Sequence, residues 1–322
     1  MERIGVLTSG GDCPGMNAAI RAVVRSGIYH GLSVYGISRG FEGLIHDEVI
    51  EMDLGSVGGI MNRGGTILMT ARSEEFKTES GMKKAVDVLK KHGIEGLVVI
   101  GGDGSFRGAH ELSKNWGIAT IGVPATIDND IAGTDYAIGF DTAVNTALEA
   151  IDRIRDTASS HRRLFVVEVM GRFSGFLALQ TGLAGGAEEV LIPETETDIE
   201  DMCSKIVKGY NRGKRSSIII VAEGDEAGGA FTVAQQIKDK IGFEVRVSVL
   251  GHQQRGGSPT ALDRVLACRL GAAAVEQLVR GNTDKMLGVI ANRVEVSNLD
   301  YAWKFKKEID MSLLTLLKML SI

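Results

Sequence analysis

The segment Gly101-Gly102-Asp103-Gly104-Ser105 places one carboxylate among glycines, directly after the apolar run Leu97 to Ile100. Such a run ending in glycine is typical of a buried strand followed by a tight turn. Glycines let backbone N–H groups approach an anion closely, and an Asp among them can bind a divalent cation. A nucleotide phosphate chain needs both, although an ordinary strand-to-helix turn can have the same composition.

A second carboxylate segment, Thr126-Ile127-Asp128-Asn129-Asp130, follows the apolar run Thr120 to Val123. A carboxylate near a substrate hydroxyl can accept its proton during phosphoryl transfer. The alternative is an Asx-type turn that caps the next element. Asp103 and Asp128 together suit a metal ligand and a general base.

The segment Thr8-Ser9-Gly10-Gly11-Asp12 follows the first predicted strand and precedes a helical pattern. A glycine pair between a strand and a helix N-terminus can bind phosphate through backbone amides. The Gly-Lys-Ser/Thr ending of a P-loop and the G-x-G-x-x-G pattern are both absent, so we expect a different binding mode.

Arginines are further candidate phosphate ligands. Arg21 and Arg25 are four residues apart on a predicted helix face, where like charges cost about a few tenths of a kcal/mol unless an anion lies between them. Two solvated arginines are the alternative, and a solvated turn is the alternative for the basic run Arg212-Gly213-Lys214-Arg215. Other arginines lie beside predicted strands, where a planar guanidinium can bind phosphate, namely Arg72, Arg163, Arg172, Arg246 and Arg255.

The composition indicates a globular protein with room for two domains, since 44% of its 322 residues are apolar and 24% are charged. A net charge of -5 argues against nucleic-acid and membrane partners. Cys13, Cys203 and Cys268 have no metal-type spacing, and no apolar run reaches about 18 residues. We therefore expect a cytoplasmic protein.

Short apolar runs alternate with helical spacing along the chain, which predicts an α/β fold with mostly parallel sheets. Ligands of such sheets bind outside the carboxyl ends of the strands. A second domain is expected from the length and from the helical segment around residues 143–157. The predicted strands are Ile4–Leu7, Ser33–Ile37, Gly96–Ile100, Thr120–Val123, Leu164–Val169, Ile218–Val221, Val245–Leu250 and Leu287–Ile290.

These segments, with Met170-Gly171-Arg172 and the loop Gly251 to Gly257, resemble the bacterial ATP-dependent 6-phosphofructokinase family in order and spacing. The resemblance runs from residue 4 to beyond 290 and leaves 292–322 uninterpreted. It implies two Rossmann-like, three-layer α/β/α domains with the active site in the cleft between them. The ATP domain would be 1–139 plus 257–303, and the fructose 6-phosphate domain 140–256 plus 304–322.

The implied reaction is a glycolytic step in which the γ-phosphoryl group of MgATP moves to the 1-hydroxyl of fructose 6-phosphate. Asp128 matches the general base, Asp103 the magnesium ligand, and Thr126, Arg72 and Arg172 other catalytic positions. The ATP site would comprise Gly11, Arg72, Ser73, Gly102, Asp103, Gly104 and Ser105. The sugar-phosphate site would comprise Thr126, Ile127, Asp128, Met170, Gly171, Arg172, Glu223, His252, Gln253, Gln254 and Arg255, with Arg163 and Arg246 from a neighbouring subunit of a homotetramer.

The resemblance also implies an allosteric site that binds ADP as activator and phosphoenolpyruvate as inhibitor. Ser216 stands where close relatives often have histidine, whereas the positive charge of the matching positions is retained. The matching positions are Arg21, Arg25, Arg155, Gly186, Ala187, Glu188, Arg212, Lys214, Arg215 and Ser216.

Two small residues indicate which phosphoryl donor the protein uses. Pyrophosphate-dependent relatives carry Asp at the position of Gly104 and Lys at that of Ala125, which fills the space for the nucleotide α-phosphate. Gly104 and Ala125 leave that space open and favour ATP, although bacterial members commonly have glycine at the latter position. The alternatives are a pyrophosphate-dependent enzyme and a catalytically silent nucleotide sensor, and Asp128 argues against the sensor.

Overall fold

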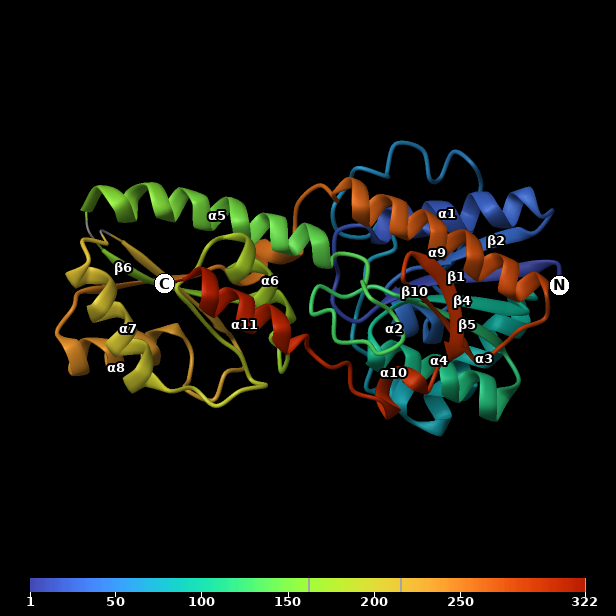
Figure 1. Cartoon of the computed structure of the whole chain (residues 1–322). Coiled ribbons are helices and arrows are strands. Elements are labelled where there is room, and N and C mark those ends of the chain that lie inside the picture. The colour runs from blue at the N-terminus through green and yellow to red at the C-terminus, as the bar shows by residue number, and fades with distance from the viewer. Residues whose placement is uncertain (162, 215, 322) are drawn as a thin grey trace. The chain divides into compact units, whose positions relative to one another are not determined.

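The chain folds into two compact units, each built on its own sheet (Figure 1). The computed structural model describes residues 1–161, 163–214 and 216–321. The first unit comprises Met1–Ile127, Ile131–Thr142 and Arg255–Lys307, and the second comprises Asp128–Asp130, Ala143–Gln254 and Glu308–Ile322. The chain therefore passes between the units several times.

The first unit contains a sheet in which parallel strands occupy the centre and antiparallel strands the edges. Alternate core side chains, among them Leu7, Leu97 and Val99, pack against one layer of helices. In sheet order its described strands are β11 (Arg293–Asn298), β10 (Lys285–Ile290), β5 (Ala119–Pro124), β4 (Gly96–Gly101), β1 (Arg3–Ser9), β2 (Ser33–Ile37) and β3 (Val49–Met52).

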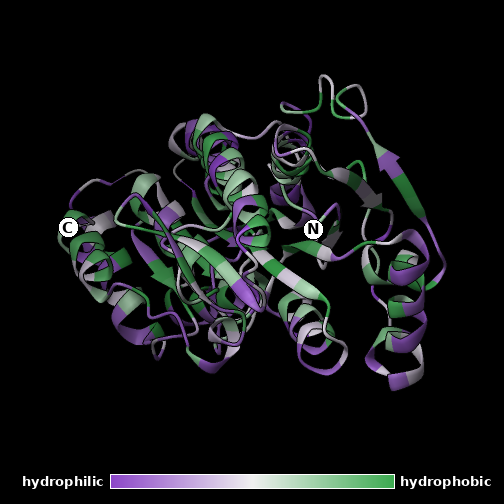
Figure 2. Cartoon of the chain, turned by 90° about the vertical axis from the view of Figure 1, so that its right-hand side faces the viewer, coloured by the Kyte–Doolittle hydropathy of each residue, from purple (hydrophilic) through white to green (hydrophobic). Residues whose placement is uncertain are grey.

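Helices cover both faces of this sheet (Figure 1). On one face, α1 (Met16–Tyr29) packs along α9 (Ala261–Val279), and a Cβ on Gly271 would lie 2.8 Å from the Ala19 carbonyl oxygen, so the helix backbones approach closely. The other face carries α2 (Gly40–Ile45), the short η1 (Glu75–Lys77), α3 (Glu79–His92), α4 (Asp103–Trp116) and α10 (Tyr301–Lys304). The helices carry both hydropathy colours in Figure 2, as expected when one side of a helix is buried.

The second unit is built on the all-parallel strand order β7-β8-β6-β9, with α7 and α8 packed over one face. The helices α6 and α11 pack together against β8 and β7. Its strands are β6 (Leu164–Val169), β7 (Glu189–Leu191), β8 (Ser217–Ala222) and β9 (Val245–Val249). Its helices are α5 (Phe140–His161, which begins in the first unit), α6 (Phe176–Ala184), α7 (Ile199–Asn211), α8 (Ala230–Ile241), the short η2 (Gly251–Arg255) and α11 (Met311–Leu320).

All eight predicted strands are confirmed to within a few residues, and so is the mostly parallel α/β fold. The sequence missed β3, β7 and β11, which are short or lie at sheet edges with many exposed side chains. Between β10 and β11, Ala291 and Asn292 have φ values of 48° and 63°, as in the two-residue hairpin turn that matches strand twist. No helix of the described residues has the length and apolar character to span a membrane.

Asp263 holds the start of α5 from a fully buried position on α9. Its carboxylate accepts hydrogen bonds from the Gly139 and Thr142 backbone amides, at 2.9 and 2.8 Å, and from the Thr142 hydroxyl at 2.5 Å. Burial raises the pKa of Asp263, and these hydrogen bonds oppose the shift only in part. A carboxylate is thus used as a helix cap between distant segments.

The Asp263→Asn variant is expected to lose about 1.5 to 3 kcal/mol of unfolding free energy, because an amide keeps one acceptor oxygen and turns N–H groups toward the remaining donors. Since the folded pKa lies above the unfolded value, the stability contributed by this carboxyl falls as pH rises through that interval. Urea titrations should therefore show a larger gap between wild type and variant at pH 4 than at pH 7. Equal stability of both proteins would contradict the capping role.

Candidate active site

Three neighbouring strands of the first unit end at the same edge of the sheet. The parallel register pairs Ser9 of β1 with Gly101 of β4, and Gly101 with Pro124 of β5. The Ala125 amide also donates to the Gly101 carbonyl oxygen at 2.9 Å. The register therefore brings together three segments, as expected for the carboxyl ends of neighbouring parallel strands. They are the glycine loop after β1, the Gly-Gly-Asp-Gly-Ser loop after β4 and Thr126-Ile127 after β5.

The loop after β4 requires glycine for two different reasons. A Cβ on Gly101 would lie 2.4 Å from the Ser9 carbonyl oxygen and 2.6 Å from Ser105 Oγ, so a side chain has no room there. A Cβ on Gly102 or Gly104 would meet nothing within 4 Å, so their missing side chains leave open space. α4 begins at Asp103, and its N-cap Gly102 has no side chain to bind the first amides. This open helix start suits an anionic group.

The guanidinium of Arg255 packs against the loop after β1. Its Nη1 donates to the Asp12 carbonyl oxygen at 3.1 Å, and a Cβ on Gly11 would lie 2.4 Å from the same nitrogen. The Thr70 hydroxyl donates to the Gly10 carbonyl oxygen at 2.7 Å, a contact the sequence did not suggest. Gly10 has a φ of 88°, a left-handed conformation that glycine adopts without strain. A guanidinium thus lies directly against a backbone that is bare of side chains.

Asp103 lies in the first turn of α4 with a half-exposed side chain. The described residues contain no cluster of three His, Cys, Asp or Glu side chains able to hold a metal ion by themselves. Asp103 beside the open space at Gly104 still fits Mg²⁺, because this ion is commonly bound through one or two carboxylates together with substrate phosphates and water. The residues therefore suit a metal that arrives with a phosphate ligand.

Arg107 is a neighbour of Asp103 that the sequence did not single out. Its Nε lies 3.9 Å from Asp103 Oδ2, one helical turn away, and its Cζ lies 5.0 Å from the centre of the Trp303 ring of α10. The four-residue spacing was the only sequence signal for this ion pair. A segment after residue 292, which the sequence left uninterpreted, thus contacts the residue that flanks Asp103.

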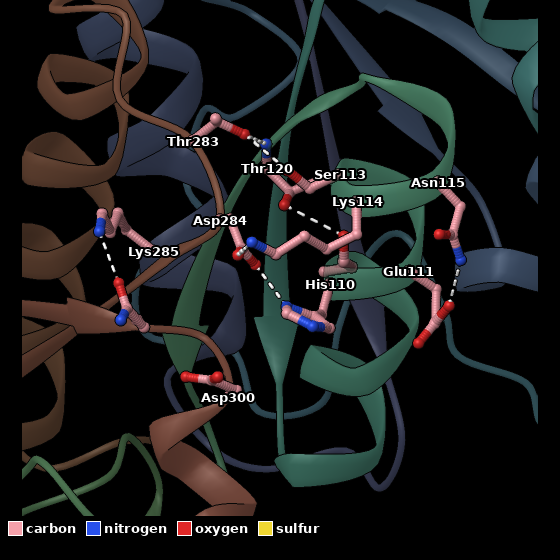
Figure 3. A network of polar contacts seen from close by, with 12 residues as sticks. His110, Glu111, Ser113, Lys114, Asn115, Thr120, Thr283, Asp284, Lys285 and Asp300 are labelled. Atoms are coloured by element: carbon pink, nitrogen blue, oxygen red, sulfur yellow. Dashed lines mark hydrogen bonds and ion pairs between the residues drawn. The ribbon is translucent and has the colours of Figure 1, made fainter.

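Polar contacts anchor the far end of α4 (Figure 3). His110 Nδ1 lies 2.6 Å and Lys114 Nζ 3.3 Å from the two oxygens of Asp284, and the hydroxyls of Ser113 and Thr283 are 2.9 Å apart. These contacts join α4 to the turn before β10. They hold the helix whose first turn carries Asp103.

Arg72 and Ser73 lie in the segment before η1, with Arg72 exposed. Ser73 Oγ accepts a hydrogen bond from the Phe76 amide at 3.1 Å and so begins η1. Phe76 stacks on Phe41 with ring centres 4.1 Å apart, and a Cβ on Gly108 would lie within 3.1 Å of both rings. Ser73 therefore has a local structural role in addition to the predicted one.

In the second unit, predicted site residues again lie close together where neighbouring strands end. The register pairs Val169 of β6 with Ala222 of β8, and the Arg172 amide donates to Glu223 Oε1 at 2.8 Å. Gly171 and Arg172 have φ values of 143° and 53°, so Glu223 stabilises a turn that few residues adopt. Met170, nearly buried, begins this turn.

The short helix η2 follows β9, which pairs with β6, and carries His252, Gln253 and Gln254. His252 and Gln253 are exposed, whereas Gln254 is fully buried and donates to the Gly251 carbonyl oxygen at 3.1 Å. The first two side chains are therefore available to a ligand, and the third stabilises the turn.

Asp128 directly follows Ile127 in the chain, and its contacts group it with the second unit. Its side chain is 2% exposed, and its carbonyl oxygen accepts a hydrogen bond from Ser174 Oγ at 3.1 Å. Ser174 Oγ also lies 2.9 Å from the Gly171 carbonyl oxygen. The Asp128 backbone is thereby tied to the turn that carries Arg172, a link through Ser174 that sequence reasoning missed.

Arg163 and Arg246 lie near the amino ends of β6 and β9, whereas Arg172 and Glu223 follow the carboxyl ends of β6 and β8. Arg163 immediately precedes β6, and Arg246 is paired with Phe165 near the start of the same strand. A six-residue strand spans about 17 to 20 Å. The structure therefore does not bring these two arginines together with Arg172, Glu223 and His252 within the unit.

The predicted effector residues divide between the two units. Arg155 Nη2 donates to the Gly186 carbonyl oxygen at 2.9 Å, and Lys214 Nζ lies 2.8 Å from Glu188 Oε1. Ala187 lies between Gly186 and Glu188 in the sequence, and its side chain is buried. Arg212 and Ser216 lie two residues before and two residues after Lys214. Arg21 and Arg25 are on α1 of the first unit, and Arg215 lies outside the described residues.

Comparison with known proteins gives consistent matches along the chain. A family model described as Phosphofructokinase matches residues 3–278. ATP-dependent 6-phosphofructokinases from Halothermothrix orenii and Natranaerobius thermophilus are 56% identical over 332 residues and 62% identical over 289 residues. These alignments cover 100% and 90%, respectively, of both partners.

Two solved structures are similar in fold. A phosphofructokinase from Saccharomyces cerevisiae matches with a TM-score of 0.88 and 36% identity, over 94% of this chain and 45% of that longer one. A pyrophosphate-dependent phosphofructokinase from Marinobacter aquaeolei matches with a TM-score of 0.84 and 23% identity, over 98% and 91% of the two chains. At that identity the second match supports the fold alone.

Proposed function

Because the chain belongs to the phosphofructokinase family, we propose that it is an ATP-dependent 6-phosphofructokinase, which phosphorylates the 1-hydroxyl of fructose 6-phosphate in glycolysis. The observation that carries this assignment is the gathering of the loops after β1, β4 and β5 at one edge of the first sheet. Those loops combine bare backbone amides with the carboxylate of Asp103, and the last of them continues directly into Asp128.

In this reaction the amides around Gly102 and Gly104 bind the donor phosphates, and Gly11 and Arg72 contribute to the same site. Mg²⁺, held by Asp103, would supply positive charge that the phosphate chain needs for transfer. Asp128 orients the acceptor hydroxyl and takes its proton as the bond from the hydroxyl oxygen to the γ-phosphorus forms, while the bond from the γ-phosphorus to the bridging oxygen breaks and ADP leaves. Arg172, presented by the turn that Glu223 holds, stabilises charge on the transferring group.

A donor assay tests this assignment. Turnover of fructose 6-phosphate is measured with MgATP or with pyrophosphate under otherwise identical conditions, with fructose 1,6-bisphosphate as the detected product. We expect turnover with ATP and essentially none with pyrophosphate, because the space at Gly104 is open to a nucleotide. The reverse pattern would establish the pyrophosphate-dependent alternative, and absence of turnover with both donors would favour a nucleotide sensor.

The positions of Arg163 and Arg246 support a site shared between subunits. Both lie at the sheet edge opposite Arg172 and Glu223, so within one unit they have no place in the same sugar-phosphate site. We propose that they serve the site of a neighbouring copy in a homotetramer, in the cytoplasm. A solution molar mass of one chain, 34.4 kDa, in an active preparation would contradict this.

The cluster of Arg155, Gly186, Glu188, Arg212 and Lys214 supports an effector site in the second unit. We propose ADP as activator and phosphoenolpyruvate as inhibitor, with Arg21 and Arg25 as further ligands. Both effectors carry phosphate, which suits a site that is rich in guanidinium and ammonium groups.

A further inference from the structure

A cavity of about 200 Å³ in the second unit extends past the expected effector residues. It is bounded by α7, by the starts of β7 and β8 and by the end of α11. The α11 contribution comes from the region that the sequence left uninterpreted. The cavity is lined by five basic side chains, Lys205, Lys208, Arg212, Lys214 and Lys318.

Acidic groups compensate two of these cations. Lys214 Nζ lies 2.8 Å from Glu188 Oε1, and Lys205 Nζ lies 3.0 Å from Glu189 Oε2, and both glutamates also line the cavity. Across residues 1–161, 163–214 and 216–321, no carboxylate lies within ion-pair distance of the remaining three, Lys208, Arg212 and Lys318. Asp201, which is not a lining residue, also lies 2.7 Å from Lys205 Nζ, and its carboxylate interacts with Lys208 and Lys318. Five positive and three negative charges thus leave the cavity with a surplus of about two positive charges, in a protein whose net charge is -5.

Helix ends explain part of this surplus. α7 ends at Asn211 and α11 at Leu320, and each helix C-terminus carries roughly half a negative charge. Basic residues in a last turn compensate that charge, which accounts for about one of the two surplus charges. Roughly one positive charge is left over, and an anionic ligand would neutralise it.

The remaining walls indicate what kind of anion fits. Met202 and Ile206, both nearly buried, form an apolar side, and Ser217 adds a hydroxyl at the start of β8. Long lysine side chains can cover such apolar surface with their methylenes while their ammonium groups face a ligand. A small organic phosphate has the matching combination of a multiply charged group and a less polar body.

We propose that the effector site extends into this cavity, and that Lys208 of α7 and Lys318 of α11 bind its phosphate-bearing ligand. The inference rests on the proposed effector site, with which the cavity shares Glu188, Arg212 and Lys214. It assigns to the C-terminal helix a binding role, since α11 supplies one of the two additional cations. Loss of either lysine weakens effector binding and leaves the fold intact, because both side chains are exposed.

The test measures phosphoenolpyruvate binding to the full chain by isothermal titration calorimetry, without fructose 6-phosphate. Lys208→Met and Lys318→Met are each expected to weaken binding about five- to tenfold, as for loss of one partly exposed, charge-assisted hydrogen bond. The matched control is Lys238→Met. Lys238 is an exposed lysine in the last turn of α8 and lies outside the cavity, so its replacement removes a helix-end charge without changing affinity.

Arg25→Ala separates failure of the extension from failure of the effector site itself. If Arg25→Ala weakens binding while Lys208→Met and Lys318→Met bind as wild type does, the extension is overturned and the effector site stands. If all three lysine variants weaken binding equally, the effect is one of general charge, and the extension is again overturned. If wild type binds no phosphoenolpyruvate and shows no ADP activation, the proposed effector site falls, and the extension falls with it.

Discussion

Asp128→Asn is expected to lower kcat about 100- to 10,000-fold while changing the affinities for ATP and fructose 6-phosphate little. The variant keeps the size of the side chain, which is 2% exposed, but cannot take the proton of the acceptor hydroxyl. A general base acts mainly in the transition state, so its loss reduces kcat more than it affects ground-state binding. Steady-state kinetics and equilibrium binding on the same preparation give the two quantities.

The matched control is Asp152→Asn, which removes an exposed carboxylate from α5 and should retain wild-type kcat. Asp128 is also tied through its carbonyl oxygen to Ser174, so a folding defect has to be separated from a chemical one. An unchanged midpoint of thermal unfolding, together with intact ATP binding, shows that the variant is folded and that the loss of kcat is chemical. Near-normal kcat for Asp128→Asn would refute the general-base assignment.

Gly104→Asp is expected to weaken ATP use by about 30-fold or more in kcat/KM for ATP, and to affect fructose 6-phosphate binding far less. A Cβ at this position meets nothing within 4 Å, so the backbone accepts the side chain. Two like charges about 4 Å apart at an effective dielectric constant of about 20 repel by roughly 4 kcal/mol, and half of that corresponds to the stated loss. An Asp near a helix N-terminus also favours the fold itself.

Gly104→Asn separates charge from size, because its side chain has the same shape without the negative charge. If repulsion of phosphate dominates, the Asn variant retains most of its ATP use. If filling of the open space dominates, both variants lose it alike. An Asp variant with wild-type KM for ATP would show that Gly104 does not determine the donor.

Strand positions and strand-end chemistry could be predicted from the sequence because both are local. An apolar run that stops at Gly101 indicates where a buried strand ends, and the next residues then lie at the carboxyl edge of a parallel sheet. That Asp103 lies in the first turn of a helix is a finding of the structure. The family resemblance added residue roles, which remain predictions for the individual side chains.

Contacts between distant segments depended on the tertiary structure. The Arg107 guanidinium over Trp303, the Asp263 cap of α5 and the convergence of Lys208 with Lys318 each join segments whose relation depends on strand register and helix packing. No local pattern encodes these distances, since each residue alone fits an ordinary surface or core position. The edge position of Arg163 and Arg246 likewise follows from the pairing of β9 with β6. The sequence by itself determined which chemistry the strand ends carry, and the tertiary structure decided which other side chains surround and support it.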